Sequence, residues 1–173
     1  TEKQVFVGGN IGVPIISYVA DLQKDDVVVA EVSSFQLETT DSFCPHLALI
    51  LNLTPDHLDR HGDMAGYLAA KAKIFANQKD SDYLVLNYDD ETLRGLESQS
   101  RGKVIFFSQQ HKLEEGVYLD GEKIILAWEG KKISICTVDE IAIKGRHNLE
   151  NAMGAITLAY LSGVTPEKIR EVL

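Results

Sequence analysis

The 173-residue sequence is poor in basic residues, in cysteine and in long apolar runs. Its 17 lysines and arginines stand against 26 acidic residues, and the net charge of −9 argues against nucleic acid as a partner. Two distant cysteines without CxxC spacing indicate a reduced, cytoplasmic setting. No run is long enough to cross a membrane, and the N-terminal "TEKQVFVGG" lacks a signal-peptide core, so no membrane partner is expected.

What the sequence does contain is typical of a globular domain. Hydrophobic residues make up 45% and charged residues 25%, and the length suffices for one domain with a substantial core. Small anionic ligands stay possible, because the local field of a pocket can oppose the global charge.

Short apolar runs separated by helical segments define the fold class. The helical segments are clearest at Met64–Gln78 and Glu91–Glu97. Near-continuous runs are typical of strands covered on both faces, so we predict an α/β fold with a doubly wound, mostly parallel sheet. The predicted strands are Val5–Asn10, Val27–Val32, Leu47–Thr54, Tyr83–Asn87 and Lys103–Phe107.

The pattern changes after these strands. Residues from about 116 to 138 alternate more and contain Asp120-Gly121 and Glu129-Gly130, which predicts a three-stranded antiparallel meander. Terminal helices are expected within residues 146–173, with Thr165 as an N-cap. The sheet lacks an obvious first strand and the chain stops inside a helix, so we expect a part of a larger protein. One face of the first terminal helix carries Leu149, Ala152, Met153, Ile156 and Tyr160.

Polar residues gather where three predicted strands end. In open parallel sheets, ligands bind beyond the carboxyl ends of the strands. Glu31 interrupts an apolar run that the sheet should bury, and an unpaired buried carboxylate is costly unless a cation such as Mg²⁺ offsets it. A salt-bridged strand residue is the simpler alternative. The other polar groups at these ends include Asn10, Ser33, Gln36 and His57.

Lys71 lies in the middle of an apolar helical stripe. At about 100° per residue, it falls among the side chains of Met64, Tyr67, Leu68 and Phe75. Lys73 is predicted on the opposite, solvent-facing side. Lys71 either snorkels to water or keeps a desolvated amine with a lowered pKa, and a neutral amine is nucleophilic, including toward CO₂.

His57 and His61 are four residues apart, and Thr54-Pro55 suggests a helix start before them. A shared helical face would suit zinc, whereas the alternative is one hydrogen-bonded and one solvated histidine. Asp59 and Arg60 are expected to form a local ion pair.

Asn148 and Asn151 lie three apart at a predicted helix start, where two amides can read a planar heterocycle, although Asn148 could simply cap the helix. "GGNIG" lacks the third glycine of a dinucleotide fingerprint, and "NYDDE" is most simply a turn and helix cap.

Six motifs together resemble the central domain of the Mur ligases, the ATP-dependent amide-forming enzymes of peptidoglycan assembly. They occur in the order of that family over nearly the whole chain. The motifs are "GGNIG", "EVSSFQLE", "LNLTPDHLDRHG", "AAKAKIF", "NYDD" and "GRHNLENA".

The resemblance implies roles for these residues. Glu31 would bind one Mg²⁺, and His57 and Lys71, as catalytic residues, would bind a second, with Lys71 carbamylated by CO₂. The UDP-muramoyl substrate would lie along Asn10, Ser33, Gln36 and His57, and the adenine of ATP along Asn148 and Asn151. The implied substrates are ATP, UDP-N-acetylmuramoyl-L-alanine and D-glutamate, joined through an acyl phosphate, and the parent protein is expected to be a monomer.

The sequence departs from the family in one respect. Members carry a GKT/S-containing P-loop just before "KQVFVGGN", and no GxxxxGK[ST] occurs in this chain. Residues 1–173 are therefore expected to be a partial ATP-binding central domain, without the N-terminal UDP-binding and C-terminal domains, and inactive alone. Three alternatives remain: a sister ligase or folylpolyglutamate synthetase, a non-catalytic nucleotide-binding domain, and a metal-dependent hydrolase using Asp56, His57 and His61.

Overall fold

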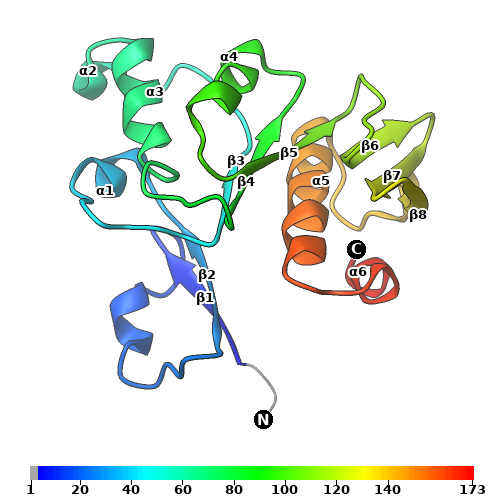
Figure 1. Cartoon of the computed structure of the whole chain (residues 1–173), viewed down its shortest axis with the longest axis horizontal. Coiled ribbons are helices and arrows are strands. Elements are labelled where there is room, and N and C mark those ends of the chain that lie inside the picture. Colours follow the sequence, from blue (N-terminus) through cyan, green and yellow to red (C-terminus); the bar gives the residue numbers. More distant parts are fainter. Residues whose placement is uncertain (1–3) are drawn as a thin grey trace.

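The computed structural model describes residues 4–173, and its strands form two sheets (Figure 1). A small parallel sheet pairs β1 (Val5–Gly9) with β2 (Val27–Glu31). The larger sheet has six strands, which neighbour one another in chain order: β3 (Leu47–Ile50), β4 (Tyr83–Asn87), β5 (Lys103–Ser108), β6 (Gly116–Asp120), β7 (Lys123–Trp128) and β8 (Lys131–Thr137).

The α/β class and the mostly parallel pairing are confirmed. Strands β3 to β6 run parallel, and β6 to β8 form the predicted antiparallel meander. Its second hairpin turns through Glu129 and Gly130, both at positive φ (48° and 75°), as a two-residue type I′ turn requires. The strands nevertheless fall into two sheets rather than one, because β2 pairs only with β1 and β3 only with β4 in the part of the chain that the structure describes.

The helices are shorter than the sequence pattern suggested. The expected helix 64–78 ends at Ala72 and continues as turns, and the expected helix 91–97 breaks after Arg94. The predicted strand 47–54 ends at Ile50. The helical elements are η1 (Ile15–Tyr18), α1 (Ser34–Glu38), α2 (Leu58–His61), α3 (Met64–Ala72), α4 (Glu91–Arg94), η2 (Glu97–Gln99), η3 (Val138–Glu140), α5 (Arg146–Leu161) and α6 (Pro166–Val172). Thr165 caps α6 as predicted, accepting from the Lys168 amide.

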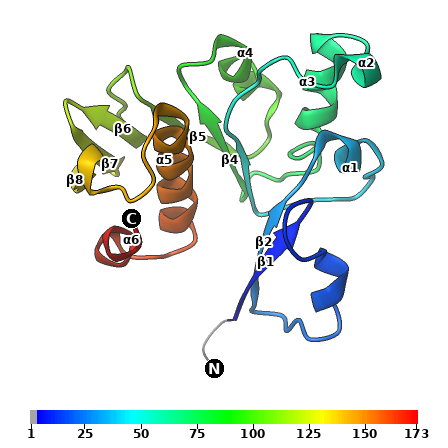
Figure 2. The same cartoon turned by 180° about the vertical axis from the view of Figure 1, so that it is seen from behind.

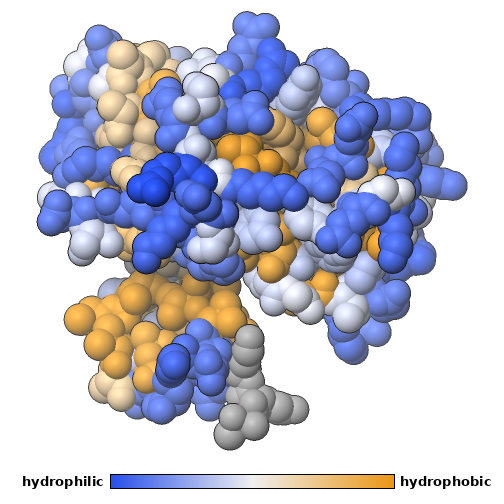
Figure 3. All heavy atoms as spheres, in the orientation of Figure 1, coloured by the Kyte–Doolittle hydropathy of each residue, from blue (hydrophilic) through white to orange (hydrophobic). Residues whose placement is uncertain are grey.

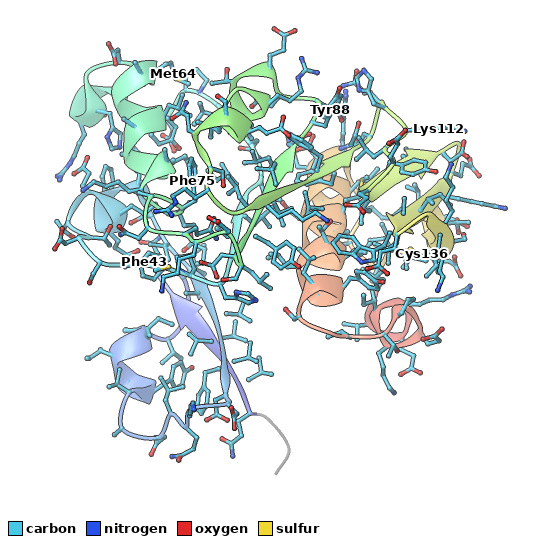
Figure 4. All side chains as sticks on the ribbon, viewed as in Figure 1. Phe43, Met64, Phe75, Tyr88, Lys112 and Cys136 are labelled. Carbon is cyan, nitrogen blue, oxygen red and sulfur yellow. The ribbon has the colours of Figure 1, made fainter. Side chains whose placement is uncertain are left out.

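Helices cover both faces of the six-stranded sheet, as Figures 1 and 2 show from opposite sides. Helix α5 packs across β3 to β6 on one face, burying Met153 and Ile156 against Val85. On the other face Leu84 and Leu86 meet a cluster that includes Phe75, which lies between α3 and the sheet in Figure 4. Consecutive β4 residues thus point to opposite covered faces, which explains an apolar run without alternation.

The N-terminal unit, residues 4–31 with β1, η1 and β2, leaves many of its apolar side chains exposed in the part of the chain that the structure describes. Figure 3 shows them as an orange surface below the six-stranded part. Val5, Val7 and Ile16 are 61%, 63% and 77% exposed. Other exposed aliphatic residues of this unit are Ile11, Val13, Val19, Val28 and Val29. Within the described residues, no helix is long and apolar enough to cross a membrane.

Candidate functional site

The carboxyl ends of β1 and β2 bring Asn10 next to Glu31. The Asn10 amide donates to the Glu31 carbonyl oxygen at 2.8 Å. A Cβ on Gly9 would lie 2.1 Å from the same oxygen, so only glycine permits this approach. The Glu31 side chain is exposed, and the expectation of a buried carboxylate is wrong here because β2 itself is mostly exposed.

Ser33 and Gln36 form a capping box at the start of α1. The Gln36 amide donates to Ser33 Oγ at 3.3 Å, and the Ser33 amide donates to Gln36 Oε1 at 2.9 Å. This reciprocal pair satisfies two amides at the helix start. Both predicted substrate-binding residues therefore also have a structural role.

His57 is the residue before α2 and has a left-handed backbone, with φ of 51°. The helix begins at Leu58, so the expected start at Thr54-Pro55 is wrong. The side chain is 50% exposed, and its Nε2 lies 3.2 Å from Asp56 Oδ2. The Asp56 carboxylate also accepts from the His57 amide at 2.9 Å, so this one residue steadies both backbone and ring.

His61, by contrast, is almost fully buried, with a side chain 2% exposed. Its Nδ1 lies 3.0 Å from Glu38 Oε1, and its Nε2 lies 3.0 Å from Ser34 Oγ. Both ring nitrogens are used within the protein, which leaves none for zinc. The two histidines thus follow the alternative of one hydrogen-bonded and one more exposed side chain.

The Glu38 carboxylate contacts the side chains of both Arg60 and His61. Arg60 donates to it at 2.9 Å, so the expected local Asp59–Arg60 pair is replaced by a contact between α2 and α1. The hydrogen bond from Arg60 is the main cause that lowers the pKa of Glu38, with charges of Arg60, His61 and Lys73 adding to it against a smaller desolvation effect.

A line of packed rings runs from His57 to Lys71. Phe35 contacts the His57 ring at 4.9 Å between centroids and stacks on His61 at 5.5 Å. His61 in turn packs against Tyr67 at 5.2 Å, and Lys71 Nζ lies 5.1 Å from the centre of the Tyr67 ring. The two predicted catalytic residues are therefore connected through three intervening side chains.

Lys71 and Lys73 differ in what their amines contact. Lys71 is half-buried, and in the described part of the chain its amine makes no hydrogen bond or ion pair. Lys73 Nζ donates to the carbonyl oxygens of Glu38 at 2.6 Å and Thr40 at 3.3 Å. The prediction that Lys73 faces solvent is wrong, because the end of α1 packs on that side of α3.

No direct contact joins Glu31 to His57 or Lys71. Among residues 4–173, no hydrogen bond or ion pair links them, and no three acidic, histidine or cysteine side chains gather closely enough to hold a metal ion. The convergence of these three residues on shared cations stays a prediction.

Asn148 and Asn151 lie in the first two turns of α5. Asn148 Nδ2 donates to the Lys144 carbonyl at 2.9 Å, and Asn151 Nδ2 points to Asn148 Oδ1 at 3.5 Å. A hollow of about 170 Å³ lies at the turn before α5, with an apolar wall that includes Ile141 and Ile143, and neither asparagine is among its lining residues. Asn148 thus secures the turn before α5 but does not cap the helix, because the N-cap of α5 is Gly145 and no side-chain cap hydrogen bond forms there.

Asp89 is a residue whose importance the sequence did not reveal. Asp90 caps α4 as expected of "NYDDE", accepting from Thr92 and Leu93 amides. Asp89 instead reaches the loop after β5, where it accepts from Ser108 Oγ and the Gln109 amide and contacts His111 Nδ1 at 3.1 Å. No local sequence pattern distinguishes the two adjacent aspartates, because the role of Asp89 depends on a loop 20 residues away.

Comparisons with known proteins identify the family of the chain. The family model of the Mur ligase middle domain matches residues 5–159. The UDP-N-acetylmuramoylalanine--D-glutamate ligase of Pelotomaculum thermopropionicum is 47% identical over 167 residues, which are 96% of this chain and 37% of that protein. The corresponding ligase of Thermoanaerobacter sp. is 44% identical over 173 residues, or 100% of this chain and 38% of that protein.

Solved structures show the same fold at low sequence identity. The MurF ligase from Thermotoga maritima, in complex with ADP, superimposes with a TM-score of 0.67 at 15% identity, covering 98% of this chain and 42% of that one. This chain spans less than two fifths of the length of the two curated relatives. On the match over residues 5–159, the chain belongs to the Mur ligase family and represents its middle domain.

Proposed function

We propose that the chain is the central-domain portion of an ATP-dependent ligase that adds D-glutamate to UDP-N-acetylmuramoyl-L-alanine. The observation that carries this proposal is the likeness to D-glutamate ligases over nearly the whole chain. In the proposed reaction, the substrate carboxylate attacks the γ-phosphate of ATP, giving an acyl phosphate and ADP. The amine of D-glutamate then attacks the acyl carbon, and phosphate leaves.

The residues present suit divalent cations in kind. Glu31 offers an exposed carboxylate, and His57 a half-exposed imidazole. The Lys71 amine has no hydrogen-bond partner in residues 4–173, and CO₂ can convert such an amine into an anionic carbamate. The Lys73 amine, in contrast, is hydrogen-bonded to backbone carbonyl oxygens. Bound Mg²⁺ would neutralise the charge that collects on the transferred phosphoryl group. Carboxylate and carbamate oxygens are ligands of the type that Mg²⁺ takes.

The remaining assignments concern the two substrates. Asn10 and Ser33 lie at the ends of β1 and β2, where ligands of parallel sheets bind, and are proposed to contact the UDP-muramoyl substrate. Asn148 and Asn151 are proposed to contact adenine. The exposed amide of Asn151 supports this, since its one side-chain hydrogen bond among residues 4–173 is a long one to Asn148.

A substrate panel on the full-length protein tests the proposed function. We expect ADP release that requires both UDP-N-acetylmuramoyl-L-alanine and D-glutamate. Release with a different amino acid, or with a folate substrate, would instead support a sister ligase or a folylpolyglutamate synthetase. The isolated 173-residue chain should release no ADP, because it contains no GxxxxGK[ST] loop to hold the phosphates.

The carbamate has its own test in native mass spectrometry. Under CO₂-equilibrated conditions, a labile species heavier by about 44 Da is expected from addition of CO₂ to the Lys71 amine. Lys71→Ala should abolish this species. Lys73→Ala, which removes the amine already bound to carbonyl oxygens, should retain it, and loss in both variants or in neither would contradict the assignment.

A further inference from the structure

His61 is a buried polar ring in a region made otherwise of short elements. Helix α2 has only four residues and α1 only five, so neither is stable by itself. The His61 ring bonds to Ser34 at the start of α1 and to Glu38 at its end. It therefore fixes the whole length of α1 relative to the loop that carries His57.

The hydrogen bonds fix the orientation of the ring. A carboxylate accepts only, so Nδ1 donates to Glu38, and Nε2 shares a hydrogen bond with the Ser34 hydroxyl. Glu38 is held from the other side by Arg60, one residue before His61. With both nitrogens satisfied and the side chain almost completely buried, the ring is placed in one orientation.

Two other aromatic rings pack against the same ring. Phe35 stacks on it with planes 15° apart, and Tyr67 lies against it at 33°. Phe35 also contacts the His57 ring, and Tyr67 lies below the Lys71 amine. A displacement of His61 would thus be transmitted in one direction to His57 and in the other to Lys71.

We propose that His61 is a positioning residue, whose buried ring sets the relative places of His57 and Lys71. The inference rests on the proposed function, because it takes these two side chains as the ligands of a divalent cation. His61 itself is not proposed as a ligand, because both of its ring nitrogens are bonded to Glu38 and Ser34. It corresponds to an outer residue that orients ligands, and loss of such residues typically reduces metal affinity or activity about 10- to 100-fold.

Two variants separate the hydrogen bonds of His61 from its stacking. His61→Phe keeps a ring between Phe35 and Tyr67 and loses both hydrogen bonds, whereas His61→Gln keeps polar groups and loses the stack. The matched control is His46→Gln. His46 also pairs with a carboxylate, that of Asp82 at 2.8 Å, and packs on a tyrosine. It lies just before β3, however, whereas the loop that carries His57 follows β3.

The first measurement uses the 173-residue chain and no substrate. In NMR spectra, nuclear Overhauser contacts between Phe35 and His57 and between Tyr67 and Lys71 should be present in the wild type. Both should weaken together in the two His61 variants and persist in His46→Gln. If both contacts persist at full strength in folded His61 variants, the proposal is wrong, and chemical shifts of β4 and β5 report whether the variants are folded.

The second measurement uses the full-length protein. The Mg²⁺ concentration for half-maximal ADP release should rise about 10-fold or more in His61→Phe, while the KM for D-glutamate changes little. An unchanged Mg²⁺ requirement in this variant would overturn the proposal. If the wild type shows no D-glutamate-dependent activity, the proposed function fails, whereas the NMR contacts still decide whether His61 positions the two side chains.

Discussion

The N-terminal unit and the six-stranded part are built from similar strands but bury them very differently. In β4, Leu84, Val85 and Leu86 are completely buried. In β1, Val5 and Val7 are more than 60% exposed. A continuous apolar run therefore predicts a strand that would be buried on both faces. It does not show that other described residues pack against those faces.

The difference also affects the candidate site. Asn10 and Glu31 belong to the N-terminal unit. The other four candidate residues come later in the chain, near α2, α3 and α5: His57, Lys71, Asn148 and Asn151. Large exposed apolar surfaces are uncommon in monomeric proteins and mark places where something else binds. The unit should accordingly contribute less to stability than the six-stranded part, and the following predictions test that contrast.

The largest effect is expected from a core truncation in α5. Met153 is completely buried against the sheet, so Met153→Ala should lower the free energy of unfolding by about 2–5 kcal/mol. Val7→Ala, at 63% exposure, should change it by less than about 0.5 kcal/mol. Chemical denaturation measures both, and a comparable loss in the two variants would refute the contrast.

Amide hydrogen exchange should show the same contrast residue by residue. Strands β4 and β5 are bonded on both sides, whereas β2 has a single neighbour within the described residues. We expect amides of β1 and β2 to exchange more than about 10-fold faster than those of β4 and β5. Equal protection of the two sets would mean that the unit unfolds only with the rest.

The smallest effect concerns pH and the far end of the six-stranded part. Hydrogen bonds from the Thr137 amide and from Arg170 lower the pKa of Glu140 to about 2 from an ordinary 4.5. The ionised form is thus favoured in the folded state, so its contribution is complete above pH 4.5 and is lost as the pH falls towards 2.

Glu140→Gln should therefore reduce the steepness with which stability falls between pH 4.5 and 2. Thermal unfolding at several pH values measures this. Glu114→Gln, which removes an exposed carboxylate without an ion pair among the described residues, is the control and should leave the slope unchanged. An identical slope in wild type and Glu140→Gln would rule out this role for Glu140.

Much of the fold follows from local sequence patterns. The bounds of β4 and the two hairpins were predictable, because apolar runs and Gly-containing turns specify them locally. Burial of Glu31 and exposure of Lys73 were predicted wrongly. Both errors concern packing between separate elements: β2 lacks the expected cover, and the end of α1 lies against Lys73.

The site shows the same division. The helical wheel placed Lys71 on the apolar stripe of α3, where it is half-buried against Tyr67, and the special role of its amine stays a prediction. The contact of Arg60 with Glu38 and the burial of His61 involve residues more than 20 positions apart, and no short motif specifies them. Sequence spacing could offer two roles for the histidines, and only the tertiary arrangement distinguished them.

The chain has a single tryptophan, Trp128, and its position determines what fluorescence can report. It ends β7, packs edge-on against Tyr160 of α5, and has the Lys103 ammonium 4.8 Å from its ring. Its emission is therefore an intrinsic probe of the meander and of its contacts with α5 and β5. A denaturant titration followed by Trp128 fluorescence would therefore not report the unfolding of β1 and β2. Far-ultraviolet circular dichroism should accompany every such curve.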